Sequence, residues 1–333
     1  MAEPAESSAG SARKAEPNGL AARLPLAARP RGSSYGACDP MRSALSALDV
    51  VRPKSLDAAL AAMGDASGDG RLVPLAGGTD VFVYLNAGTP PGRRYLDLWG
   101  LRELCGIRVH RAGVDLGALT TFREIREHSI MRRRFPSLVA ASAEIGAWQI
   151  QNRATIAGNI ANASPAGDSL PVLLTLDAVV HARSMRGARD IPFDQLYRSY
   201  RELTLERDEL ITGVSLPYPP ARSHAFFRKV GTRRAQSISK VVFAGLLACD
   251  REGSVGHVRL AYGSVAPVPL RALRAEEELL GQRPSRAVAA LARAALERDI
   301  APIDDIRSRR DYRLAVAGNV LEQFLRSVDP AFA

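Results

Sequence analysis

Two short segments of small residues place the tightest constraint on how this chain can fold. Residues 74–80 read Pro-Leu-Ala-Gly-Gly-Thr-Asp, and residues 155–168 read Thr-Ile-Ala-Gly-Asn-Ile-Ala-Asn-Ala-Ser-Pro-Ala-Gly-Asp. Both combine hydroxyl groups and backbone N–H groups with little side-chain bulk, which a chain needs where it lies against phosphate. Together they predict a diphosphate-containing cofactor that is held from two sides.

The first segment has neither a GxGxxG pattern nor a Walker lysine. Its glycines, Gly77 and Gly78, permit backbone angles that aim successive N–H groups at one anion. Thr79 adds a hydroxyl donor, and a helix expected to start near Val81 adds the positive end of its dipole. Taken alone, the same four residues also fit an ordinary tight turn.

The second segment is more specific, because its polar residues alternate with Ile156 and Ile160, which a solvent-exposed loop would not carry. A buried polar loop must find partners for its donors, and a ligand is the simplest source of acceptors. Asp168 has two interpretations: it accepts hydrogen bonds from sugar hydroxyls, or it caps the helix that Ser169 opens.

Hydrophobic periodicity predicts an α+β protein with a domain boundary at the proline-rich stretch 217–220. Before it we expect helices over 56–63 (capped by Ser55), 81–85, 135–148 and from 169 onward, and strands over 71–75, 95–98, 114–119, 178–183 and 210–216. After it we expect strands over 225–230, 240–249 and 255–264, then helices over 271–280, 287–297 and 312–325. The expected domains are 45–217, with subdomains of about 45–100 and 101–217, and 222–328.

Residues 1–44 are rich in Ala, Ser, Gly, Pro and Arg and poor in aromatic residues, which predicts a disordered N-terminal extension. They lack the apolar centre of a secretory signal and contain acidic residues that a mitochondrial transit peptide avoids. Met41 stands where foldable sequence begins, so we expect it to be a natural translation start.

Composition narrows the function further. The net charge of +10 indicates either an anionic partner or simply a basic surface, and the longest basic cluster is Arg132 to Arg134. The cysteines, Cys38, Cys105 and Cys249, form no CxxC pair, so they supply neither a metal site nor an iron–sulfur cluster. No stretch approaches the roughly 18 apolar residues of a membrane span. We expect a cytoplasmic protein.

Residues 75–80 and 154–169 resemble the two flavin loops of the FAD-binding (medium) subunits of molybdenum hydroxylases, the xanthine dehydrogenase and carbon monoxide dehydrogenase family. The similarity covers roughly residues 45–328. Its other parts are 52–56 at the start of the domain and Lys229, 233–234, 262–266 and 311–313 in the C-terminal half. The chain departs from the family at Ala157, where a second glycine is usual, and at 235–238, where many relatives carry an acid.

The resemblance implies an FAD-binding domain of the PCMH/vanillyl-alcohol-oxidase type, with two α/β subdomains. An α+β C-terminal domain follows, with a three-stranded antiparallel sheet and a three-helix bundle. FAD would lie extended between the subdomains. The residues matched to cofactor-binding positions are Ala76, Gly77, Gly78, Thr79, Asp80, Ile145, Thr155, Gly158, Asn159, Ser164, Asp168, Ile211 and Lys229.

Each match implies a role. Residues 77–79 would hold the pyrophosphate, residues 155, 158 and 159 the pyrophosphate and the flavin end, and Asp168 the sugar hydroxyls. Ile145 falls on the adenine side and Ile211 on an apolar wall near the ring. Lys229 falls beside the pyrimidine edge, where a cation stabilises the anionic reduced flavin. From residue type alone, Ile145 is a helix-core residue and Lys229 a strand-surface residue.

The implied function is electron transfer within a xanthine dehydrogenase-like oxidoreductase of purine catabolism. A molybdopterin large subunit would hydroxylate a purine or other heterocycle, and a small subunit with [2Fe–2S] clusters would deliver electrons to the FAD. NAD+ or another acceptor would receive them, in a dimer of heterotrimers. This chain would contribute no catalytic side chain.

Two other functions remain open. A stand-alone FAD-dependent oxidase of the vanillyl-alcohol oxidase fold often attaches its flavin through His or Cys, but the five His and three Cys avoid both glycine segments. A basic nucleic-acid-binding protein would show steeply salt-dependent affinity, yet the sequence has no recognition motif.

Overall fold

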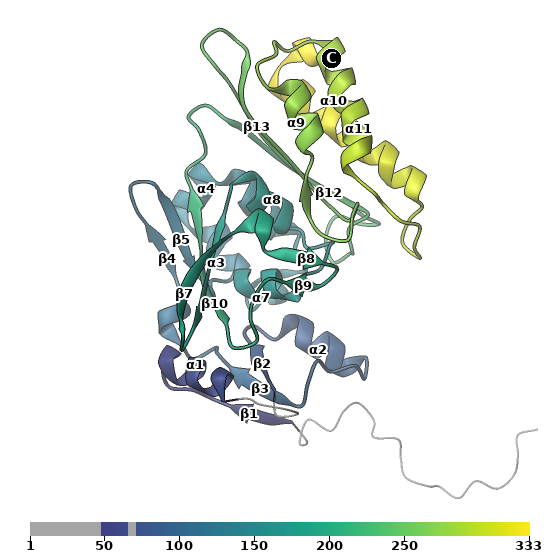
Figure 1. Cartoon of the computed structure of the whole chain (residues 1–333). Coiled ribbons are helices and arrows are strands. Elements are labelled where there is room, and N and C mark those ends of the chain that lie inside the picture. Colours follow the sequence, from purple (N-terminus) through teal and green to yellow (C-terminus); the bar gives the residue numbers. More distant parts are fainter. Residues whose placement is uncertain (1–47, 66–70) are drawn as a thin grey trace, which may run out of the picture. The chain divides into compact units, whose positions relative to one another are not determined.

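The computed structural model describes residues 48–65 and 71–333 (Figure 1). The expected N-terminal extension, residues 1–44, and the expected start at Met41 lie outside this part of the chain. Two hydrophobic cores organise the described residues. The first contains buried residues from Leu56 to Leu216 together with Ala244 and Ala261, and the second contains buried residues from Val241 to Phe332.

The first core begins with a parallel sheet in the order β1 (Asp49–Val51), β3 (Arg94–Asp97), β2 (Leu72–Leu75). In the sequence, α1 (Leu56–Gly64) comes between β1 and β2, and α2 (Thr79–Asn86) comes between β2 and β3. Ser55 caps α1 as expected, its hydroxyl accepting from the N–H of Ala58 at 3.1 Å. The first glycine segment follows β2, so it lies at the carboxyl edge of this sheet, where α/β proteins bind ligands.

The same core continues into a five-stranded antiparallel sheet in the order β4-β5-β10-β6-β7. Its helices come between β5 and β6 in the sequence, and the small pair β8-β9 forms a separate two-stranded sheet. The strands are β4 (Ile107–Val109), β5 (Gly113–Gly117), β6 (Val179–Ser184), β7 (Gly187–Pro192), β8 (Tyr197–Ser199), β9 (Glu202–Leu203) and β10 (Leu210–Pro217). The helices are α3 (Phe122–Glu127), α4 (Ser129–Arg134), α5 (Pro136–Glu144), α6 (Trp148–Gln151), α7 (Ile156–Asn162) and α8 (Leu170–Thr175).

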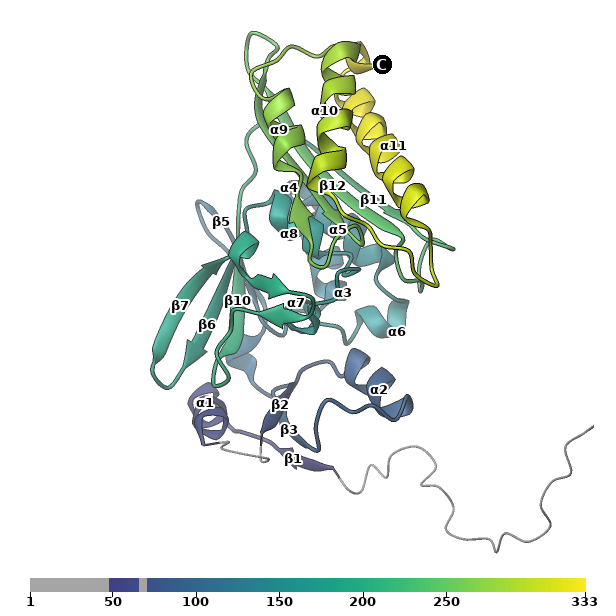
Figure 2. The same cartoon turned by 45° about the vertical axis from the view of Figure 1, so that its right-hand side comes forward.

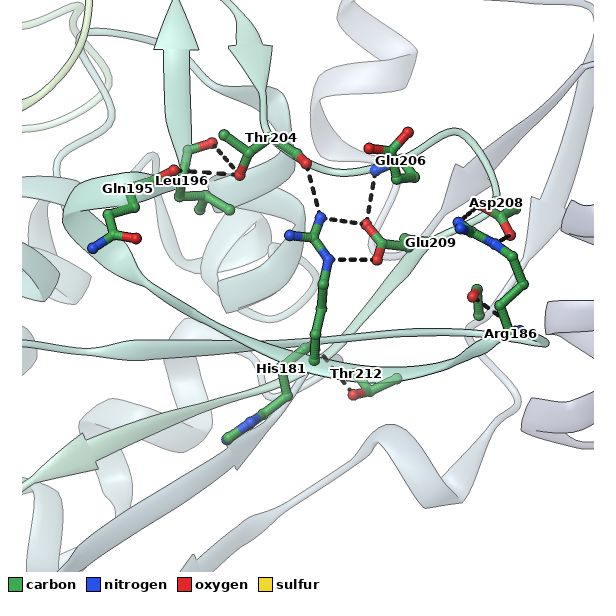
Figure 3. A network of polar contacts seen from close by, with 11 residues as sticks. His181, Arg186, Gln195, Leu196, Thr204, Glu206, Asp208, Glu209 and Thr212 are labelled. Atoms are coloured by element: carbon green, nitrogen blue, oxygen red, sulfur yellow. Dashed lines mark hydrogen bonds and ion pairs between the residues drawn. The ribbon is translucent and has the colours of Figure 1, made fainter.

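Ion pairs connect residues 208–209, which come just before β10, to the β6–β7 hairpin (Figure 3). Arg189 donates to both carboxylate oxygens of Glu209, at 2.6 and 2.7 Å, and to the carbonyl oxygen of Thr204 at 2.8 Å. Glu209 also accepts from the N–H of Glu206 at 2.7 Å, and only 7% of its side chain is exposed. This network fixes where β10, which carries Ile211, enters the sheet.

We expect the change Glu209→Gln to lower the free energy of unfolding at pH 7 by about 1–3 kcal/mol, because a charge-assisted pair is lost. Hydrogen bonds from Arg189 hold the pKa of Glu209 below its usual value. The contribution is therefore present above the ordinary glutamate pKa and lost as the pH falls through the lower folded value. Urea unfolding should show the difference between wild type and variant shrinking as the pH falls below the ordinary glutamate pKa of about 4.3. A difference that persists unchanged at pH 3 would contradict this.

The second core lies between a four-stranded antiparallel sheet and three helices. Figures 1 and 2 show α9 (Leu273–Leu279), α10 (Arg286–Asp299) and α11 (Arg310–Val328) on one side of β11 (His224–Val230), β12 (Val241–Cys249) and β13 (Val255–Gly263). α5 and α8 contact the same sheet and connect it to the first core. Consequently β12 is buried along almost its whole length, which explains its unbroken apolar sequence.

Three expectations need correction. The C-terminal sheet has a fourth strand, β14 (Leu270–Arg271), whose two residues are too short to give a pattern. The expected helix 135–148 is divided into α5 and α6 around Gly146, which has a left-handed φ of 54°. Part of the second glycine segment, expected as a loop, is the helix α7. No helix of the described residues is long and apolar enough to cross a membrane.

Candidate cofactor site

The two glycine segments are in direct contact. A methyl group added to Gly77 would lie 1.8 Å from the carbonyl oxygen of Arg153, and one added to Gly158 would lie 4.0 Å from the methyl group of Ala76. The helices that follow the two segments are also joined, because the Tyr84 hydroxyl donates to Oδ1 of Asn162 at 2.9 Å. The two segments that the sequence singled out therefore lie side by side.

The N-terminus of α2 leaves several backbone donors unused. Gly78 is its N-cap, with a left-handed φ of 77°, and no side chain caps the helix. Among the described residues, no acceptor bonds the N–H groups of Thr79, Asp80 or Val81, whereas Phe82 N–H already donates to Gly78 O. Gly78 is thus needed for its backbone angle and Gly77 for its closeness to Arg153. Three N–H groups at the positive end of a helix form a site for an anion.

The first turn of α7, in contrast, is already satisfied. The Thr155 hydroxyl accepts from Gly158 N–H at 3.1 Å, Ile156 N–H donates to Thr120 O, and Ala157 N–H donates to Ala118 O. In this conformation Thr155 and Gly158 therefore bond each other. Ala157 does not have a positive φ, so its methyl group is tolerated.

Other polar residues of the second segment form hydrogen bonds within the segment or to residues of the protein next to it. Asn159 Oδ1 accepts from the Ser169 hydroxyl at 2.7 Å, which leaves its amide N–H groups without a described partner. The Ser164 hydroxyl accepts from Ala166 N–H, and Pro165 O accepts from Ser264 N–H in the C-terminal sheet region.

Asp168 does not cap a helix, because Ser169 occupies the N-cap position of α8. One Asp168 oxygen accepts from Lys229 Nζ and the other from the Ser239 hydroxyl, both at 2.6 Å. The Asp168 and Lys229 side chains are 9% and 2% exposed, so this is a buried ion pair. Burial raises the pKa of Asp168, and Lys229 and Ser239 oppose that shift.

Lys229 and Ser239 stand at opposite ends of the β11–β12 connection, residues 231–240, so one carboxylate fastens both of its ends. Lys229 also donates to the carbonyl oxygen of Glu144 at 3.2 Å, directly beside the buried Ile145. The resemblance places Ile145 and Lys229 toward opposite ends of an extended dinucleotide, whereas the structure brings them together. Ile211, also buried, belongs to β10 and packs into the first core.

A pocket of about 350 Å³ adjoins this cluster on the side of Gly146. Arg126, which lies 4.5 Å from the Trp148 ring and bonds Gln151, lines it together with Arg233 and Gln236 from the β11–β12 connection. The Trp148 side chain is 61% exposed. Sequence reasoning missed this pocket, and its only local signal was the large aromatic residue after Gly146.

Comparison with known proteins accounts for nearly all the described residues. Residues 45–219 match the FAD binding domain in molybdopterin dehydrogenase, and residues 226–328 match the CO dehydrogenase flavoprotein C-terminal domain. The chain is 34% identical to the xanthine dehydrogenase FAD-binding subunit of Escherichia coli O157:H7, over 72% of this chain and 82% of that protein. It is 33% identical to the nicotinate dehydrogenase FAD-subunit of Eubacterium barkeri, over 62% and 71%.

Comparison of the fold with solved structures agrees with the sequence matches. A chain of carbon monoxide dehydrogenase from Hydrogenophaga pseudoflava superimposes with a TM-score of 0.81 at 27% identity, covering 86% of this chain and 98% of that one. The expected architecture, an FAD-binding domain followed by an α+β C-terminal domain, is confirmed. This chain belongs to the family of FAD-binding subunits of molybdenum hydroxylases, which are oxidoreductases, and its cofactor is FAD.

Proposed function

We propose that this chain is the electron-transfer subunit of a xanthine dehydrogenase-like complex in the cytoplasm. It would take electrons from the [2Fe–2S] clusters of a small subunit and pass them to NAD+ or another acceptor, beside a molybdopterin large subunit in a dimer of heterotrimers. The observation that supports the proposal is the group of three backbone N–H donors at the start of α2 that have no hydrogen-bond acceptor among the described residues. This start of α2 lies next to the second glycine segment. That donor set fits the diphosphate of FAD.

In this proposal the N–H groups of Thr79, Asp80 and Val81 hold the diphosphate oxygens, and Ala76, Gly77 and Gly78 let the chain approach them. The positive end of α2 adds to the attraction. The N–H groups at the start of α7 are already hydrogen-bonded within the protein. In this proposal Thr155 and Gly158 therefore shape the side of the site formed by α7 and do not donate to the diphosphate. The free amide N–H groups of Asn159 are its available donors, and Ser164 follows toward the sugar hydroxyls, whereas both oxygens of Asp168 are already bonded to Lys229 and Ser239.

We assign the flavin ring to the end of the site where Lys229 lies. Ile145 belongs there too, because the neighbouring Glu144 carbonyl accepts from Lys229, and Ile211 completes the apolar wall. FAD supplies the redox chemistry when it is bound. Lys229 contributes a positive charge that favours negative charge on the pyrimidine edge, and Asp168 holds that ammonium group in place.

The pocket beside Gly146 suits the acceptor. Two guanidinium groups and an exposed indole ring, from Arg126, Arg233 and Trp148, fit the phosphates and bases of a dinucleotide such as NAD+. A stand-alone oxidase would instead turn over an alcohol or amine without partner subunits, and that measurement separates the two functions.

The purified chain should be yellow and contain FAD. We expect the change Asn159→Ala to weaken FAD binding by about 5- to 15-fold, because it removes the free amide donors. Flavin fluorescence titration of the apoprotein measures this. The matched control is Asn319→Ala in α11, whose side chain bonds Arg293. Colourless, folded protein that takes up no FAD would refute the proposed function, and an Asn159→Ala variant with wild-type affinity would refute this site assignment.

A further inference from the structure

Arg153, which sequence reasoning passed over, connects the two glycine segments. It precedes the second segment, and its guanidinium Nε lies 3.4 Å from the carbonyl oxygen of Gly77 in the first. Its own carbonyl oxygen is the atom against which Gly77 packs. Side chain and backbone of this one residue therefore both contact the segment from which α2 starts.

Trp99 fixes the direction of the Arg153 side chain. The guanidinium carbon lies 3.6 Å from the centre of the Trp99 ring, a close cation–π contact. Trp99 follows β3, and its backbone N–H donates to Oδ1 of Asp97 at 3.1 Å, so the residue lies at the carboxyl edge of the parallel sheet. The Gly77 segment follows β2 at the same edge.

The charge of Arg153 is uncompensated. Among residues 48–65 and 71–333 no carboxylate forms an ion pair with it, and its two terminal nitrogens have no hydrogen-bond partner. The residue is exposed, and Gly77, whose carbonyl oxygen its side chain contacts, comes two residues before the first free N–H group of α2. A fixed cation next to unused helix donors, with no protein anion to neutralise them, calls for an anionic ligand that touches both.

We propose that the Arg153 guanidinium is a direct ligand of the FAD diphosphate and that Trp99 is the positioning residue that holds it there. This rests on the proposed function. With Nε directed at Gly77 O and one face on Trp99, the terminal nitrogens are the donors left for phosphate oxygens. Lysine would supply the charge but neither the planar fork nor the same stacking.

The experiment measures binding of three ligands to the full-length apoprotein: FAD, ADP, which carries the diphosphate without the flavin, and riboflavin, which has no phosphate. For Arg153→Gln we expect FAD and ADP affinity to fall about 10- to 100-fold with riboflavin affinity unchanged. Arg153→Lys should lie between wild type and Arg153→Gln. Trp99→Leu should show the same selectivity with a smaller loss, because the cation remains but is no longer oriented.

Arg108→Gln is the matched control, since Arg108 is an exposed residue of the edge strand β4, and it should change none of the three affinities. If Arg153 only joined the two segments, its substitution would lower the apoprotein Tm and weaken all three ligands alike, or none; either result overturns the proposal. Should Arg153→Gln not fold, the FAD-to-riboflavin ratio of Arg153→Lys decides instead. Wild-type protein that binds neither FAD nor ADP would refute the proposed function itself.

Discussion

Replacing Gly77 with alanine is expected to reduce FAD affinity by at least about 100-fold, because losing two hydrogen bonds to a charged phosphate costs about 1.5–3 kcal/mol each. The added methyl group would lie 1.8 Å from the carbonyl oxygen of Arg153 and 2.5 Å from its carbonyl carbon. Both are backbone atoms and cannot turn aside as a flexible side chain can. The contact is relieved only if the two segments separate. That separation displaces the start of α2, and its three free N–H groups are displaced with it.

The neighbouring glycines provide graded comparisons. At Gly100, in the same subdomain, an added methyl group meets nothing within 4 Å, so Gly100→Ala should bind FAD like wild type. At Gly158 the nearest atom is the Thr155 hydroxyl oxygen at 2.9 Å, a side-chain atom that can move, so we expect an intermediate loss. Titration of the apoproteins with FAD, together with their Tm values, tests the series. If Gly77→Ala bound FAD as tightly as Gly100→Ala, α2 would not be the diphosphate site.

Local features of this fold were predictable from the sequence. Ser55 caps its helix as expected, and Thr121 forms a capping box with Glu124 whose bonds likewise span only three residues. The strand before Ala76 was also predictable, and the structure places the small residues after it at the end of that strand. These signals depend on chemistry within one turn or one strand.

The remaining features depend on contacts between distant residues. Ile156 and Ile160 are buried in the first core and draw the second segment into a helix, although its glycine, asparagine and serine content predicts a loop. The partners of Asp168 lie 61 and 71 residues further along the chain. Neither spacing nor residue type reveals such pairs, so both sequence interpretations of Asp168 overlooked its bond to Lys229.

That buried pair gives the second large effect. We expect Lys229→Met to lower the free energy of unfolding of the apoprotein by about 3–5 kcal/mol, because it leaves the Asp168 carboxylate buried without its cation. Combining it with Asp168→Asn should recover much of the loss, since the neutral amide still accepts from Ser239. Urea unfolding at pH 7 measures the cycle. Lys240→Met is the control: its ammonium group lies 5.0 Å from the Tyr312 ring and pairs with no described carboxylate.

The pH dependence of the Lys229→Met variant distinguishes a buried charge from simple loss of packing. Without the ammonium group, only the Ser239 hydroxyl still opposes the effect of burial on Asp168, so the pKa of Asp168 rises further above the unfolded value. A carboxyl group with a raised folded pKa binds more protons in the folded state, so stability falls as the pH rises through that range. Lowering the pH from 7 to 5 should therefore stabilise Lys229→Met relative to wild type, and the double variant should show no such gain. If Lys229→Met costs no more than Lys240→Met at every pH, the carboxyl group is already neutral in the wild-type fold and holds the β11–β12 connection by hydrogen bonds alone.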